Sequence, residues 1–203
     1  MMGFTNARGV TEPDMQTEIS GYNHTLWERL EERFTPSMKN PPVGSLTYYM
    51  GFEWLVVHWD VENGAMYLAL KDIYSLTSFG RPMDGGSSYE MIFISALDSF
   101  QRALEGDFST LSGIIEGEED NQTPPPEMPE AFIPTMSQME EFTLFRNEPL
   151  SRVAFYQGSR KEWWIYQTEP LYKATYVDVF GAYQRATMTA NFGLRPFICV
   201  NMR

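Results

Sequence analysis

Two hydrophobic stretches early in the chain have the composition of β-strands. Residues 45–50 and residues 52–61 are rich in aromatic and β-branched side chains, which predicts one strand in each stretch. Asn63-Gly64 favours a type I′ turn, so the pattern predicts a hairpin between the second strand and residues 65–70. Both sets of alternating positions in the second strand are apolar, and we expect it to be covered on both faces.

A four-residue repeat of apolar positions predicts a helix in the middle of the chain. The repeat consists of Ile92, Ala96, Phe100 and Leu104. Ser87 and Glu90 have the spacing of a capping box before it, and Gly106 stands where a C-terminal cap is expected. A second short helix is predicted over residues 108–115.

The last third of the chain returns to strand-like patterns. After a short extended piece over residues 131–135, Ser137 and Glu140 have capping-box spacing and predict the start of a third helix. The strand-like runs cover residues 152–156, 162–167, 175–180, 183–188 and 196–201, with Gly158, Gly181 and Gly193 between them. The order of strands, helices and strands predicts an α+β fold.

Residues 1–40 are predicted to form an arm outside a domain that covers residues 41–203. Residues 1–24 are polar, and Thr25 with Glu28 has the spacing of a capping box. A short amphipathic helix follows, and the candidate assembly contacts on it are Leu26, Trp27, Leu30 and Phe34. Such a helix either docks on a partner or packs on its own domain, and both interpretations stay open.

Residues 116–130 interrupt the pattern inside the domain. They combine acidic side chains with four prolines and carry too little apolar surface to hold a fixed helix or strand. We interpret the segment as an exposed acidic loop, and a linker between two domains is the alternative.

Composition and charge restrict the functional classes. The chain has 203 residues, with 15 basic and 27 acidic side chains, and the net charge of −12 argues against nucleic-acid binding. The single cysteine, Cys199, excludes an intrachain disulfide, and two histidines are too few for a His-rich metal site. No apolar run approaches the roughly 18 residues of a membrane span. Residues 1–8 lack the apolar stretch of a signal peptide, so we expect the protein to be made in a cytoplasm without membrane insertion.

Several segments together resemble a family of uncharacterised domains from bacterial surface proteins and bacteriophage proteins. Gly193-Leu194-Arg195-Pro196 resembles the family's C-terminal Gly-(Val/Leu)-Arg-Pro motif. Trp163-Trp164 resembles the start of its Trp-Trp-Leu-Arg-Ser-Pro stretch, although Tyr166 stands where that stretch has arginine. Gly51-Phe52-Glu53-Trp54 is the best match to its opening strand pair. The matches follow the family's order over residues 43–203.

The resemblance implies a particular fold and particular structural residues. The family is similar to the C-type-lectin-like fold, which it shares with the formylglycine-generating-enzyme superfamily. The expected domain is α+β, with paired terminal strands, flanking helices and long irregular loops. We expect Arg195 to make a buried charge-assisted bond that ties the last strand to the domain, and Trp54 and Trp164 to be structural.

The chemistry of the related proteins is not matched by these residues. Leucine follows both Glu-Pro pairs, at Leu150 and Leu171, where a calcium lectin needs another oxygen ligand. The formylglycine-generating enzymes use a pair of cysteines, and this chain has only Cys199. His58 and Asp60 lie two apart on a predicted strand, but a hydrogen-bonded structural histidine is the favoured interpretation. We therefore expect neither metal nor cofactor.

Aromatic residues in the last third supply a candidate binding surface. Side chains alternate along strands, so part of this set is expected to be exposed for sugar stacking or protein contacts. The candidates are Trp163, Tyr166, Tyr172, Tyr176 and Tyr183.

These observations lead to a functional prediction. The chain is expected to be a non-enzymatic bacteriophage virion protein that displays a lectin-like domain, as a capsid decoration or a tail or receptor-binding component. Its expected partners are other virion proteins and copies of itself, with a host-surface glycan or protein as a further candidate. An enzyme of the formylglycine-generating-like superfamily and a bacterial surface binding protein of unknown ligand are the alternatives.

Overall fold

The computed structural model describes residues 41–83, 89–115, 128–167 and 173–201. The predicted arm, residues 116–127 of the predicted acidic loop, and Tyr172 lie outside the described residues.

The first sheet of the described domain joins the two ends of the chain. Its strands, in spatial order, are β1 (Leu46–Tyr49), β2 (Phe52–Asp60), β3 (Ala65–Leu70), β14 (Phe197–Asn201) and β7 (Ala131–Phe132). All neighbours are antiparallel, and Ile198 of β14 stands opposite Leu68 of β3. The last strand therefore pairs with the opening hairpin.

The β2–β3 hairpin forms where the sequence predicts it, but its loop differs from the predicted type I′ turn. Four residues separate the strands, and of the Asn63-Gly64 pair only Gly64 has a positive φ. The reason is the Asp60 carboxylate, which accepts hydrogen bonds from the backbone N–H of Asn63 at 3.1 Å and from its side-chain amide at 2.7 Å. This local bond holds Asn63 outside the left-handed region.

The second sheet contains strands that the sequence pattern did not predict. Its order is β12 (Tyr183–Thr187), β11 (Lys173–Val177), β10 (Trp163–Trp164), β13 (Asn191–Leu194) and β4 (Ser75–Ser78). Only the β10–β13 pair is parallel among these neighbours. β4 and β13 lie outside the predicted strands, and Gly193, expected to separate strands, lies inside β13.

Two small hairpins complete the strands of the described residues. They pair β5 (Arg81–Pro82) with β6 (Tyr89–Glu90), and β8 (Ala154–Tyr156) with β9 (Ser159–Lys161). Glu90 belongs to β6, and its carboxylate binds Arg81 Nε at 2.6 Å. The predicted capping role of Glu90 is therefore wrong, because Glu90 lies in a strand that ends before the helix begins at Phe93. Its predicted partner Ser87 lies outside the described residues.

One long helix replaces the two helices predicted in the middle of the chain. α2 (Phe93–Ile115) continues through Gly106, which was expected to end it. A glycine inside a helix costs only about 1 kcal/mol, so neighbouring helical residues can override it. Of the predicted repeat, Phe100 and Leu104 are buried, Ala96 is half-buried, and Ile92 lies just before the helix. Phe93, at the start of the helix, is buried as well.

The predicted third helix exists but begins two residues earlier than expected. α3 (Met136–Glu141) is capped by Thr135, whose hydroxyl accepts from the Gln138 backbone while the Gln138 side chain accepts from the Thr135 backbone. The predicted box of Ser137 and Glu140 is wrong, because Thr135 and Gln138 have the same spacing and take that role. α4 (Thr143–Asn147) and the 3-10 turn η1 (Pro149–Arg152) follow.

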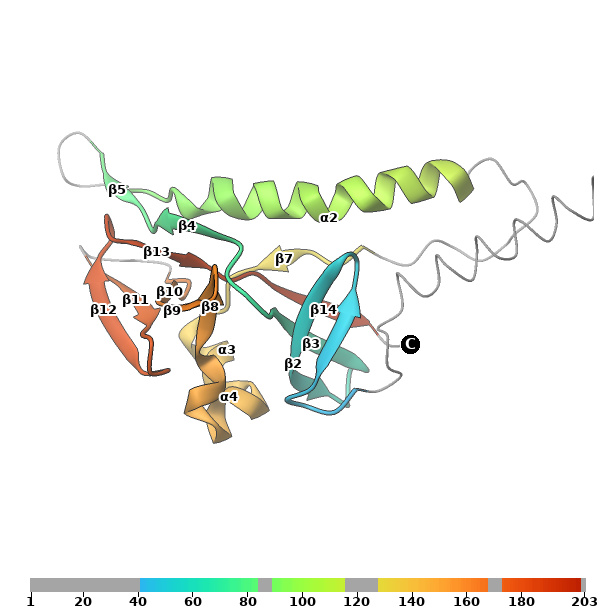
Figure 1. Cartoon of the computed structure of the whole chain (residues 1–203), viewed down its shortest axis with the longest axis horizontal. Coiled ribbons are helices and arrows are strands. Elements are labelled where there is room, and N and C mark those ends of the chain that lie inside the picture. The colour runs from blue at the N-terminus through green and yellow to red at the C-terminus, as the bar shows by residue number, and fades with distance from the viewer. Residues whose placement is uncertain (1–40, 84–88, 116–127, 168–172, 202–203) are drawn as a thin grey trace, which may run out of the picture.

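The helices cover the sheets from two sides (Figure 1). α2 lies across both sheets, since Phe93 packs with Trp164 of the second sheet while Phe100 and Leu104 pack with Trp54 of the first. α3 and α4 lie on the other side, against the opposite face of the first sheet. The domain is α+β, with most of its strands in antiparallel pairs. Within the described residues, no helix is long and apolar enough to cross a membrane.

Candidate functional site

Two connections between the sheets lie side by side at the centre of the domain. The chain leaves the first sheet after β3 and enters the second at β4, and it returns from β13 to β14. The backbone N–H of Leu70 donates to Pro196 O at 2.9 Å, and that of Tyr74 donates to Leu194 O at 2.9 Å. Residues 70–74 are therefore fixed by residues 193–196, the Gly-Leu-Arg-Pro motif.

Each remaining position of the motif also contacts residues 70–74. A Cβ on Gly193 would lie 2.5 Å from Cδ1 of Ile73, so the isoleucine side chain occupies the space that only glycine leaves open. Arg195 Nε donates to Leu70 O at 2.7 Å, and Arg195 Nη2 reaches Lys71 O at 3.5 Å. The motif therefore acts as a clamp on this segment, and we call residues 193–196 the clamp.

Arg195 is a buried cation whose hydrogen bonds go to carbonyl groups. It is 1% exposed, and Nη1 donates to Arg152 O at 3.2 Å, so all three nitrogen atoms have a partner. Its guanidinium carbon lies 5.3 Å from the ring centre of Trp163 and 5.8 Å from that of Phe145. Burial lowers the pKa of Arg195 to about 10, a shift that the charge of Asp72 opposes, and the group stays protonated at neutral pH.

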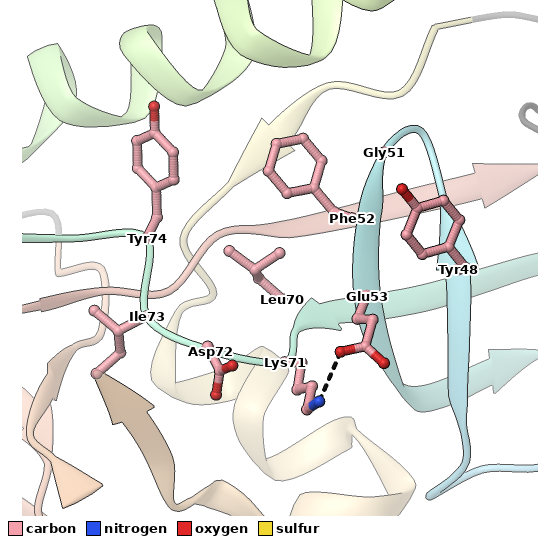
Figure 2. Close-up of a pocket in the computed structure, with 9 residues that line it drawn as sticks. All are labelled: Tyr48, Gly51, Phe52, Glu53, Leu70, Lys71, Asp72, Ile73 and Tyr74. Carbon is pink, nitrogen blue, oxygen red and sulfur yellow. Dashed lines mark hydrogen bonds and ion pairs between the residues drawn. The ribbon is translucent and has the colours of Figure 1, made fainter. Parts of the chain in front are cut away.

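The clamped segment forms one wall of an open pocket of about 360 Å³ (Figure 2). The end of the β1–β2 hairpin forms the other wall. Aromatic side chains of Tyr48, Phe52 and Tyr74 line one side of the pocket, and Leu70 lies between them and a group of charged side chains. The pocket therefore has an aromatic side and a charged side, with Leu70 between them.

The charged side of the pocket consists of Glu53, Lys71 and Asp72. Lys71 Nζ lies 2.6 Å from Glu53 Oε2, and this hydrogen bond, with the charge of Glu53, raises the pKa of Lys71. Their side chains are 41% and 52% exposed, so solvent weakens the pair. Asp72 is exposed and makes neither a hydrogen bond nor an ion pair with any residue that the structure describes. The pocket thus presents one carboxylate that the described part of the domain does not use in such a bond.

The aromatic side of the pocket is supported by α2. The ring of Phe100 lies 5.2 Å from the ring of Phe52 and 5.0 Å from that of Tyr74, between ring centres. Phe100 is fully buried, so two of the three pocket rings are held by one core side chain. The pocket is therefore built on rigid parts of the fold on both sides.

The four described members of the predicted aromatic binding surface do not form one exposed platform. Trp163 is fully buried, and its indole N–H donates to Arg152 O at 2.9 Å, so its expected surface role is wrong. β10 is the middle strand of its sheet, and both of its faces are covered: Trp163 packs in one core cluster and Trp164 in another. The alternation of side chains therefore exposes neither face.

The described tyrosines of the predicted set are half-buried and engaged elsewhere. The ring of Tyr176 lies 4.4 Å from that of Phe192, and the ring of Tyr166 packs 6.1 Å from that of Phe93. The Arg152 guanidinium lies 4.4 Å from the ring centre of Tyr183.

The residues expected to be structural lie in the core. Trp54 is fully buried and donates from its indole N–H to Tyr49 O at 2.8 Å, and Trp164 is fully buried and donates to Thr77 O at 2.9 Å. The assembly residues of the predicted arm lie outside the described residues.

The remaining chemical candidates have structural partners. His58 Nδ1 lies 2.9 Å from the Thr143 hydroxyl, and Asp60 holds the β2–β3 loop. Burial raises the pKa of the Cys199 thiol. Within the described ranges, no group of three or more His, Cys, Asp or Glu side chains is placed to hold a metal ion.

Sequence reasoning missed the pocket. One wall comes from the end of the β1–β2 hairpin and the other from residues 70–74. The signal that could have indicated the pocket is the charged pair Lys71-Asp72, which directly follows the predicted strand of residues 65–70. Comparison of the chain with protein-family models, with curated proteins and with solved structures gives no match.

Proposed function

We propose that the chain is a non-enzymatic structural or adhesion protein of a bacteriophage particle, carried as a capsid decoration or a tail or receptor-binding component. In this proposal a lectin-like domain of residues 41–203 is displayed, and the arm of residues 1–40 binds other virion proteins or further copies of the chain. A glycan or protein of the host surface is the proposed receptor.

The observation that carries this proposal is the use of the clamp to fix a surface pocket. Gly193, Leu194, Arg195 and Pro196 all contact the segment that forms one pocket wall. The motif that resembles the bacteriophage and bacterial-surface family is thus placed to shape an exposed site.

The structural use of buried and half-buried polar side chains supports a binding role over catalysis. The guanidinium groups of Arg195 and Arg152 donate to backbone carbonyls, and His58 bonds to Thr143. These groups maintain the fold, and what the domain offers to solvent is a rigid surface.

The test uses purified particles from the host that carries the gene, with the chain counted by quantitative mass spectrometry. We expect a fixed number of copies per particle. Leu30→Asp with Phe34→Asp would disrupt the predicted apolar stripe of the arm and should remove most copies, while Glu32→Gln, on the predicted polar side of the same helix, should not. Particles that lack the wild-type chain would contradict the virion role, and normal incorporation of the double variant would contradict the role of the arm.

A further inference from the structure

We propose that the pocket between the β1–β2 hairpin and residues 70–74 receives a cationic side chain, arginine or lysine, of a protein partner. The proposal rests on the binding function proposed above and gives that function a site and a ligand chemistry. The occupant is an amphipathic group: an aliphatic stem that ends in a positive charge.

The two sides of the pocket match the two parts of such a side chain. The stem of an arginine or lysine packs well on apolar and aromatic surface while its charged end stays near polar groups. Phe52, Leu70 and Tyr74 provide the apolar surface, and the Asp72 carboxylate stands on the charged side (Figure 2). When the charged end of such a side chain reaches Asp72, its aliphatic stem would therefore pack on Leu70.

The charges of the pocket favour a cation. The Lys71 ammonium is already bound to Glu53 at 2.6 Å, which leaves the Asp72 carboxylate without a hydrogen-bonded or ion-paired partner among the described residues. The charge of Asp72 acts on Lys71 and on the nearby guanidinium of Arg195. Arg195 is nevertheless 1% exposed and directs its nitrogen atoms to carbonyls, so the Asp72 oxygen atoms stay open to a ligand. The net charge of −12 over the chain also attracts a cationic partner at long range.

The pocket needs little reorganisation to bind. Four backbone N–H groups of residues 70–74 donate to other parts of the domain: Leu70 to Pro196, Lys71 to Glu53, Ile73 to Phe155, and Tyr74 to Leu194. A wall fixed in this way loses little conformational freedom when a ligand binds, which favours affinity.

The test is titration of the full chain with three acetylated and amidated tripeptides, Gly-Arg-Gly, Gly-Lys-Gly and Gly-citrulline-Gly, followed by NMR. Citrulline has nearly the shape of arginine without the charge. We expect the arginine and lysine peptides to shift the amide signals of Phe52 and Asp72, with the citrulline peptide at least about tenfold weaker. Equal binding of all three peptides, or shifts at other residues only, would overturn the proposal.

Variants separate the pocket from general electrostatics. Asp72→Asn should weaken the arginine peptide at least about tenfold, and Asp72→Glu should keep the binding. Glu105→Gln removes an exposed carboxylate from α2 and should change nothing. Unchanged binding by Asp72→Asn, or equal weakening by Glu105→Gln, would contradict a site at Asp72. Thermal unfolding of each variant checks that the fold is kept.

The two proposals fail in different ways. Peptide binding without incorporation into particles contradicts only the virion role. Incorporation into particles without peptide binding contradicts only the cation pocket, and Asp72→Asn is expected to enter particles normally because the arm is unchanged.

Discussion

Replacement of Arg195 by lysine tests whether the clamp holds the pocket wall. Lysine keeps the positive charge and much of the length of the side chain, but it has one nitrogen atom in place of a planar fork. Arg195 uses three nitrogen atoms to reach Leu70 O, Arg152 O and Lys71 O at 2.7, 3.2 and 3.5 Å. A single ammonium group keeps the shortest bond and loses the other two.

The size of the effect follows from these contacts. Arg152 O also accepts the indole N–H of Trp163 at 2.9 Å, so that carbonyl stays bonded, while Lys71 O loses its guanidinium partner. The loss of one good and one long hydrogen bond to a buried charge should lower the free energy of unfolding by about 2–4 kcal/mol. For a domain of this size the loss lowers Tm by about 4–16 °C.

The assay is urea unfolding monitored by tryptophan fluorescence, with amide hydrogen exchange on the folded state. Exchange should become faster at Leu70, Ile73 and Tyr74, because the clamp binds that segment. The matched control is Arg185→Lys, which makes the same chemical change at an exposed arginine of β12 and should stay within about 0.5 kcal/mol of the wild type. An Arg195→Lys protein as stable as that control, with unchanged exchange in residues 70–74, would refute the reasoning.

Two further substitutions test local features of the fold. Gly193→Ala should lower the free energy of unfolding by about 1–3 kcal/mol, because the added Cβ would lie 2.5 Å from Ile73. In a protein that already carries Ile73→Ala, the same Gly193→Ala change should lower the free energy of unfolding by less. An equal effect of Gly193→Ala with and without Ile73 would contradict the contact. Thr135→Ala removes a helix cap and should lower the free energy of unfolding by about 0.5–2 kcal/mol, whereas Ser137→Ala should lower it by less than about 0.5 kcal/mol. If chemical unfolding gives the larger loss for Ser137→Ala, Ser137 is the cap and Thr135 is not.

Local patterns in the sequence predicted the elements that depend on local chemistry. The hairpin around Asn63 and Gly64 and the apolar face of α2 follow from neighbouring residues, and both are present. The cap of α3 was misplaced because Thr135 and Ser137 each have a suitable partner three residues later, and the sequence pattern does not rank them.

Features that depend on distant contacts could not be predicted in this way. The exposure of Trp163 was misjudged because alternation along a strand says nothing about what covers its second face, and both faces of β10 are covered. The bond from Arg195 to Leu70 joins residues that lie 125 positions apart in the chain. The sequence led us to expect a buried bond from Arg195. The acceptor, Leu70 O, could not be predicted, because it depends on which two segments that connect the sheets lie side by side.

The pocket lies beside the contact between residues 70–74 and residues 193–196, and this position gives the buried Arg195 cation a structural role. Burial of Arg195 lowers its pKa to about 10, which means that folding works against the charge, and an apolar side chain would avoid this cost. A nonpolar side chain has no donors for the carbonyls of Leu70 and Lys71, and those carbonyls belong to the segment that carries Asp72. The buried charge therefore fixes the geometry of the pocket wall, and Asp72, on the same segment, points its carboxylate to the proposed cationic ligand.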